Sequence, residues 1–236
     1  MTVLEHLSEL RKRLVITLVA VAIGSGFGWS LFDRVVDLVV APARPYLTGP
    51  ADGRLFFTSP LEAFTTRLKL GTYVGFALAF PVVLYQFWRF VSPGLERKEK
   101  RYAIPFVVVG MALFCSGVVF AYYTLPQALR FLISPAITGG AISPLLTAKA
   151  YIGFTMLYLI SFGLAFEFPV VLMFLTLTRL VSSRKMGRYR RQVLVGIAVL
   201  AAVATPSVDI LTMGVLTSVL YLMFEASILL SRLLKR

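Results

Sequence analysis

The sequence has few of the residues from which catalytic and metal sites are built. Its 236 residues include one cysteine and one histidine, Cys115 and His6. This excludes a disulfide framework and a zinc site made from a histidine or cysteine cluster. Asparagine is absent, so no N-glycosylation sequon exists. We therefore expect no metal ion and no cofactor.

Catalytic motifs are missing as well. The chain contains neither a GxSxG nucleophile elbow nor a phosphate-binding loop. The apolar runs hold no pair of aspartates, which disfavours aspartyl proteolysis. An intramembrane hydrolase stays as an alternative, but it lacks a nucleophile and base. We expect no catalytic residues and a protein that is not an enzyme.

Charge is also scarce, at 15% of residues, whereas 58% are hydrophobic and the mean hydropathy is +0.83. A soluble domain of this size would need a far more charged surface. About 20 apolar residues suffice for a helix to cross the hydrocarbon core. Six runs are of suitable length: Leu14–Phe32, Leu70–Trp88, Tyr102–Leu129, Ala150–Thr178, Gln192–Val208 and Ile210–Ser231. The sequence predicts an all-α polytopic membrane protein with six transmembrane helices.

The basic residues alternate between the segments that join these runs. With the N-terminus placed inside, 17 of the 24 lysines and arginines fall on inner segments. The positive-inside rule then places both termini in the cytoplasm. The net charge of +13 favours anionic lipid headgroups as partners. Nucleic acid is not expected as a partner.

Residues 1–236 are expected to form a single integral membrane domain. Thr2 and Glu5 have the spacing of a capping box, so residues 1–13 are expected to form an interfacial cytoplasmic helix. Residues 33–66, rich in proline and glycine, are expected to form an outer cap. Residues 89–101 and 179–191 form basic inner loops. The fifth span is short because Pro206 follows only 14 residues after it begins at Gln192.

Two glutamates interrupt the apolar runs. Glu167 lies deep in the fourth run, where a charged side chain is costly, and Pro169 two residues later predicts a bend beside it. Either Glu167 is functional in a polar pocket, or it is a neutral acid that joins two helices by hydrogen bonds. Glu225 lies near the end of its run, where a structural role is favoured.

Four acids lie on the inner segments: Glu5, Glu9, Glu96 and Glu99. One interpretation is that they pair with bases four residues away, as Glu9 with Arg13 would. The other is that converging carboxylates bind a cationic peptide that the basic surroundings would otherwise repel, and arginine suits bidentate contact with carboxylate.

Several long motifs now become specific. The segment Glu5-His-Leu-Ser-Glu-Leu-Arg-Lys-Arg-Leu14 resembles the N-terminal signature of the TatC family, the receptor subunit of the twin-arginine protein translocase. Residues 80–101 resemble its second span and first inner loop. Phe162-Gly-Leu-Ala-Phe-Glu-Phe-Pro169 is similar to its fourth span with the embedded acid. The resemblance covers nearly the whole chain.

The resemblance implies a curved, glove-like bundle, and it implies roles for individual residues. The fifth and sixth spans are expected to be short. Signal-peptide binding is carried over to Glu9, Glu99, Arg11, Phe90, Pro93 and Leu95. Glu167 would be a polar group in the concave face. Thr205 and Thr212 would dock a partner helix, although Thr212 stands where a glutamine is common. The outer-cap positions are Pro42, Pro60, Glu62 and Phe64.

The resemblance also implies the function. Such a protein binds Arg-Arg signal peptides of folded precursors at the cytoplasmic face of the bacterial inner membrane. With the single-span proteins TatA and TatB, and with other copies of itself, it supports export driven by the proton-motive force. From the residues alone, a proton-coupled solute transporter using Glu167 and a structural scaffold remain alternatives.

Overall fold

The structure is a computed structural model that describes residues 3–47, 54–91, 103–133, 146–177, 187–204 and 210–233. Its helices are α1 Val3–Ser30, α2 Phe32–Val40, the 3-10 helix η1 Ala41–Tyr46, α3 Pro60–Val91, α4 Ala103–Leu132, α6 Ala148–Ala165, α7 Phe168–Leu177, α9 Arg190–Ala204 and α10 Ile210–Leu233. The β-structure in these ranges is an isolated bridge between Phe56 and Thr147. The expected all-α class is confirmed.

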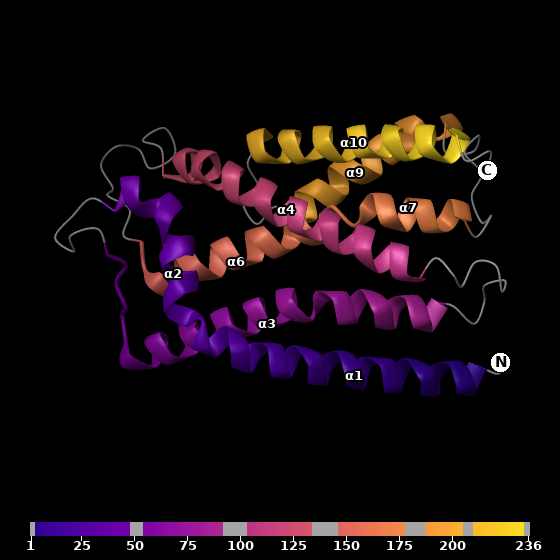
Figure 1. The fold of residues 1–236 in the computed structure, drawn as a ribbon. Coiled ribbons are helices and arrows are strands. Elements are labelled where there is room, and N and C mark those ends of the chain that lie inside the picture. Colours follow the sequence, from indigo (N-terminus) through magenta and orange to yellow (C-terminus); the bar gives the residue numbers. More distant parts are fainter. Residues whose placement is uncertain are drawn as a thin grey trace.

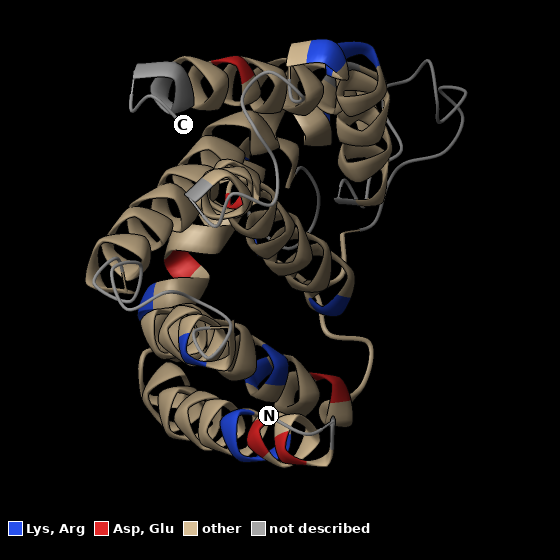
Figure 2. Ribbon diagram, turned by 90° about the vertical axis from the view of Figure 1, so that its right-hand side faces the viewer, with Lys and Arg blue, Asp and Glu red and all other residues tan. Residues whose placement is uncertain are grey.

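The long helices run up and down past one another (Figure 1). Helix α1 begins, and α10 ends, at the same end of the molecule, which we call the terminal end. Helix α2, η1 and residues 54–59 lie at the opposite end, which we call the cap end. Seen along the helices, the arrangement follows a curve instead of closing into a ring (Figure 2).

The described residues contain five helical segments that are long and apolar enough to cross a membrane. Helix α9 is a further apolar helix of 15 residues, about 22 Å at about 1.5 Å per residue. It is shorter than the hydrocarbon core of about 30 Å, as expected of the fifth span. Helix α10 has 24 residues, or about 36 Å, so the sixth is not short. In Figure 1 the first turn of α10 does not reach the cap end.

The N-terminal segment differs from its expectation. Helix α1 is continuous from Val3 to Ser30, so residues 3–13 extend the axis of the first span and do not form a separate helix. The reason is local: residues 3–23 contain no proline or glycine, and leucine, glutamate, lysine and arginine all favour helix. Nothing in this stretch gives the chain a point at which to turn.

Helix α1 packs mainly on α3, and glycines form the contact. Gly24 and Gly28 of α1 face Gly75 and Gly71 of α3 across the interface. A Cβ added at Gly24 would lie 2.6 Å from the carbonyl oxygen of Gly75, too close for any side chain. Two small residues spaced by four on each helix allow the backbones to touch, a common way to pack helices in lipid.

The largest cluster of buried side chains joins α4, α6, α9 and α10. It contains Phe162, Leu220 and Phe224, each with no exposed surface. Half of the most apolar window of α6 and α7 is buried, against 11% for α1. Helix α6 is thus central, and α1 presents most of its apolar surface outward, as a helix surrounded by lipid does.

We predict that Gly24→Ala lowers the thermal stability of the purified protein. The methyl group would meet the backbone of α3, and overpacking of this kind typically costs about 1–3 kcal/mol. Gly26→Ala is the matched control, because a Cβ there meets nothing within 4 Å. It should be neutral or slightly stabilising, since alanine favours helix more than glycine. Equal melting temperatures for the two variants would contradict the close contact.

Candidate functional site

Glu9 and Arg13 form an ion pair that also reaches the neighbouring helix. Arg13 Nη2 donates to Glu9 Oε1 at 2.8 Å, and Arg13 Nη1 donates to Gln86 Oε1 of α3 at 3.2 Å. The side chains of Glu9 and Arg13 are only 17% and 13% exposed. The expected pairing of Glu9 with the base four residues later is therefore present. Through the bond from Arg13 to Gln86, the pair connects α1 to α3 near the terminal end.

A second contact lies beside this ion pair. The rings of His6 and Phe90 stack with their centroids 4.4 Å apart. Because His6 lies one helical turn before Glu9, this contact places Phe90 near the carboxylate. Of the residues expected to bind a signal peptide, the structure thus brings Glu9 and Phe90 together, whereas Arg11 is exposed on the surface of α1.

The carboxylate of Glu9 is only half engaged. Its Oε2 is buried and has no hydrogen-bond partner among the described residues. A guanidinium group makes its strongest contact with a carboxylate through two parallel hydrogen bonds, and Arg13 uses only one oxygen. Because Oε2 is covered, an arginine from another chain would reach it only after neighbouring side chains moved, and it would have to share or displace Arg13 at Oε1.

Four expected site residues lie outside the described residues: Glu99, Pro93, Leu95 and Thr205. The proposed meeting of Glu9 and Glu99 therefore stays a prediction.

Thr212 lies in the first turn of α10, but its side chain is only 5% exposed. The outward-facing residues near it are Ile210 and Val215, 83% and 36% exposed. In this structure a neighbouring helix would contact those two residues rather than the Thr212 side chain.

Glu167 lies at a break in the fourth span. Phe166 and Glu167 form a turn between α6 and α7, and Pro169 occupies the first turn of α7, where a missing N–H does no harm. The predicted bend is confirmed. Oε1 of Glu167 is buried and has no hydrogen-bond partner among the described residues. A Cβ at Gly110 of α4 would lie 3.1 Å from Oε2, so Gly110 makes room for the carboxyl group.

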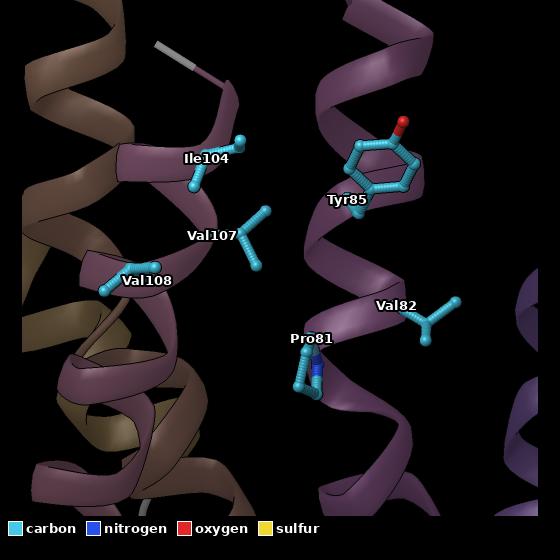
Figure 3. A pocket seen from close by; sticks show the side chains of 6 residues that line it. All are labelled: Pro81, Val82, Tyr85, Ile104, Val107 and Val108. Atoms are coloured by element: carbon cyan, nitrogen blue, oxygen red, sulfur yellow. The ribbon is translucent and has the colours of Figure 1, made fainter.

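An apolar groove of about 290 Å³ lies between α3 and α4. Figure 3 shows the residues that line it: Pro81, Val82 and Tyr85 from α3, and Ile104, Val107 and Val108 from α4. Tyr85 immediately precedes Gln86, the partner of Arg13, so the groove reaches the level of the Glu9–Arg13 pair along α3. Sequence reasoning did not identify this groove, because its two walls come from separate spans.

At the cap end, Glu62 joins three segments. Its Oε2 accepts hydrogen bonds from the backbone N–H and hydroxyl of Thr58, and its Oε1 accepts from the N–H of Lys149 at 3.1 Å. The side chain is 5% exposed. The N–H of Ala148 donates to the carbonyl of Phe56 at 2.8 Å. Glu62 thus holds residues 54–59 and α3 against the N-terminus of α6, where a carboxylate is favourable.

The other expected cap residues have simpler places. Pro60 begins α3, and Pro42 lies in the first turn of η1, both positions that suit proline. Phe64 is 55% exposed, and its ring lies edge-on to Trp29 with the centroids 5.9 Å apart. The glutamate near the terminal end of α10 is structural, as expected: Glu225 pairs with Arg190 at 2.7 Å.

No group of three or more histidine, cysteine, aspartate and glutamate side chains that could hold a metal ion occurs among the described residues. The acids of the site are instead separate: Glu9 and Glu62 mark opposite ends of the molecule, and Glu167 lies at the break between α6 and α7. Such an arrangement can bind and position a peptide chain.

Comparison with known proteins now adds to this geometry. Residues 5–218 match the family model described as Sec-independent protein translocase protein (TatC). A relative described as Sec-independent protein translocase protein TatC, from Carboxydothermus hydrogenoformans, is 34% identical over all of this chain and 94% of its own length. One of the same description from Aquifex aeolicus is 36% identical, over all of this chain and 97% of its own.

Two solved structures are also similar. A crystal structure of the twin arginine translocase receptor TatC has a TM-score of 0.78 and 36% identity, and the match covers 98% of this chain and all of that one. A second, of the same receptor in the detergent DDM, has a TM-score of 0.79 and 35% identity over 96% and 99% of the two chains.

We predict that Glu62→Ala loosens the cap end. The substitution leaves the N–H groups of Thr58 and Lys149 without their acceptor, and a buried unpaired donor typically costs about 1–3 kcal/mol. Hydrogen exchange at the Lys149 amide should become at least tenfold faster in detergent-purified protein. Glu62→Gln, which keeps one acceptor oxygen, is the matched control and should fall between wild type and alanine. Unchanged exchange at Lys149 in the alanine variant would show that Glu62 does not hold the cap.

Proposed function

The chain belongs to the TatC family of Sec-independent protein translocase proteins, and from this premise we propose that it is the signal-peptide receptor of its translocase. It is a membrane-embedded component of the twin-arginine translocase and acts in transport rather than as an enzyme. In the proposal, it binds Arg-Arg signal peptides of folded precursors. With TatA, TatB and other copies of itself, it supports export driven by the proton-motive force.

The observation that carries the proposal is the half-engaged carboxylate of Glu9. It is held between α1 and α3, and one of its oxygens is covered and has no hydrogen-bond partner among the described residues. Arginine is the side chain best suited to complete such a site, because its planar guanidinium group bonds carboxylates in a fixed geometry. A second arginine would be bound by Glu99.

The terminal end is assigned to the cytoplasm of the bacterial cell, with both chain termini on that side. The support is the distribution of charge: 17 of the 24 basic residues belong to segments that the alternation of spans places on one side. Positive residues are retained on the cytoplasmic side during insertion. A signal peptide would then meet Glu9 before crossing, which is the order that a receptor requires.

The apolar segment of the signal peptide follows its arginines. We propose that it inserts along the concave face toward Glu167, beginning beside the groove between α3 and α4. The groove walls are apolar, so they suit an apolar segment that leaves water. The uncompensated carboxyl oxygen of Glu167 offers a polar contact at depth, where few polar groups are available.

We predict that Glu9→Gln and Glu99→Gln each weaken the binding of a fluorescent twin-arginine peptide to protein in nanodiscs. Hydrogen bonds to charged groups contribute about 1.5–3 kcal/mol, so the Kd should rise about tenfold or more for each variant. Binding should also weaken as salt increases, because partly exposed charge pairs are screened.

Glu5→Gln and Glu96→Gln are matched controls, since each removes the same charge from the same segment. Both should keep the wild-type Kd within about twofold. A double Glu9→Gln, Glu99→Gln variant that inserts normally and binds the peptide as wild type does would refute the proposed receptor site.

We predict that Glu167→Gln separates binding from transport. Glutamine keeps hydrogen-bonding capacity but cannot ionise, and Glu167 lies at the break between α6 and α7, whereas the Glu9 pair joins α1 to α3. Peptide affinity should stay within about twofold, whereas export of a precursor by cells or vesicles should fall severalfold. Normal export by the glutamine variant would show that the acid is structural.

A further inference from the structure

A second cavity lies at the cap end and is separate from the site described above. Its volume is about 400 Å³, within the range of about 300–1,000 Å³ for small-molecule sites. It is bounded by α2, η1, residues 54–57 and the first turns of α6. Glu62 and the bridge between Phe56 and Thr147 hold residues 54–57 against α6. The hydroxyl of Tyr151 in α6 donates to the carbonyl of Val39 in α2 at 2.7 Å and holds that wall. The cavity therefore has fixed walls.

Most of the cavity's lining is apolar. Phe32, Val36 and Val40 recur every four residues on α2 and so form one wall. Ala148 and Ile152 of α6, 2% and 3% exposed, contribute the opposite wall. Such walls suit a hydrocarbon chain, which would remain in contact with apolar surface and not with water.

Three charged residues also line the cavity: Asp37 of α2, Arg44 of η1 and Arg54. All three are exposed. The ion pairs recorded among the described residues join Glu9 to Arg13 and Arg190 to Glu225, so none of the three charges is neutralised in this way. Two cations and one anion thus stand beside an apolar space without ionic partners among the described residues.

This combination matches one class of ligand. A phosphodiester carries one negative charge and accepts hydrogen bonds from arginine, and a primary ammonium group donates hydrogen bonds to a carboxylate. Leu38 and Phe57 beside the cavity are 59% and 50% exposed, so apolar surface that suits acyl chains lies next to the charged residues.

We propose that this cavity binds a phospholipid whose headgroup carries a primary amine. Arg44 and Arg54 hold the phosphate, Asp37 holds the ammonium group, and an acyl chain enters between α2 and α6. A choline headgroup fits less well, since its quaternary ammonium has no N–H to donate. A glycerol headgroup leaves Asp37 without a cation. The inference does not depend on the signal-peptide site, which lies at the opposite end of the molecule.

The test is native mass spectrometry of the full chain in detergent, mixed in turn with dioleoylphosphatidylethanolamine, dioleoylphosphatidylcholine and dioleoylphosphatidylglycerol. Wild type should retain one molecule of the ethanolamine lipid at severalfold higher occupancy than either of the others. An Arg44→Gln, Arg54→Gln double variant should lose at least fivefold of that occupancy. Asp37→Asn should lower ethanolamine-lipid retention and raise that of the glycerol lipid.

Arg34→Gln is the matched control. Arg34 is an exposed arginine of α2, the helix that carries Asp37, and it does not line the cavity. It should retain the ethanolamine lipid as wild type does. Melting temperatures measured without added lipid verify that each variant is folded. Equal retention by the double variant and by Arg34→Gln would overturn the proposal. Equal retention of the three lipids by wild type, or displacement of the lipid by millimolar inorganic phosphate, would do so as well.

Discussion

The close contact between α1 and α3 sets the geometry on which the candidate receptor site depends. The two helices run in opposite directions (Figure 1). Residues that face each other therefore lie the same number of positions from the glycine contact on each helix. Gly24 meets Gly75, and eleven residues away on each helix Arg13 meets Gln86. Eleven residues are about three helical turns, which returns the side chains to the same face. The glycine contact and the ion pair near the terminal end therefore share one register.

This register explains why Glu9 is presented as it is. An isolated pair between Glu9 and Arg13 on one exposed helix would be worth little, since such pairs are screened and mobile. Here the bond from Arg13 to Gln86 holds the guanidinium group against α3, and the two side chains are mostly covered. The carboxylate is consequently fixed with one oxygen bonded to Arg13 and the other buried without a partner among the described residues. For Glu9, the local pairing with Arg13 thus does not rule out the proposed peptide binding.

The sequence predicts most of what depends on local or cumulative properties. The apolar runs predict the spans, and Pro169 after Glu167 predicts the break between α6 and α7, because both follow from residues close in the chain. The Arg13–Gln86 bond joins residues 73 positions apart, and the cap-end cavity has walls from α2 and α6. Neither produces a periodic or compositional signal. The continuity of α1 is not predicted, because a capping box indicates where a helix begins and not where it ends.

The acids within the candidate spans show how an apolar protein accommodates carboxylates, and which of them are available for binding. A buried carboxylate needs hydrogen bonds or an opposite charge. Both carboxylate oxygens of Glu62 accept hydrogen bonds, from backbone N–H groups and a hydroxyl. Both oxygens of Glu225 accept hydrogen bonds as well, from Arg190 and Tyr221. Glu9 and Glu167 each keep one buried oxygen without a partner among the described residues. Fully satisfied acids hold helices together, whereas Glu9 and Glu167 keep the hydrogen-bonding capacity that the proposed signal-peptide contacts would use.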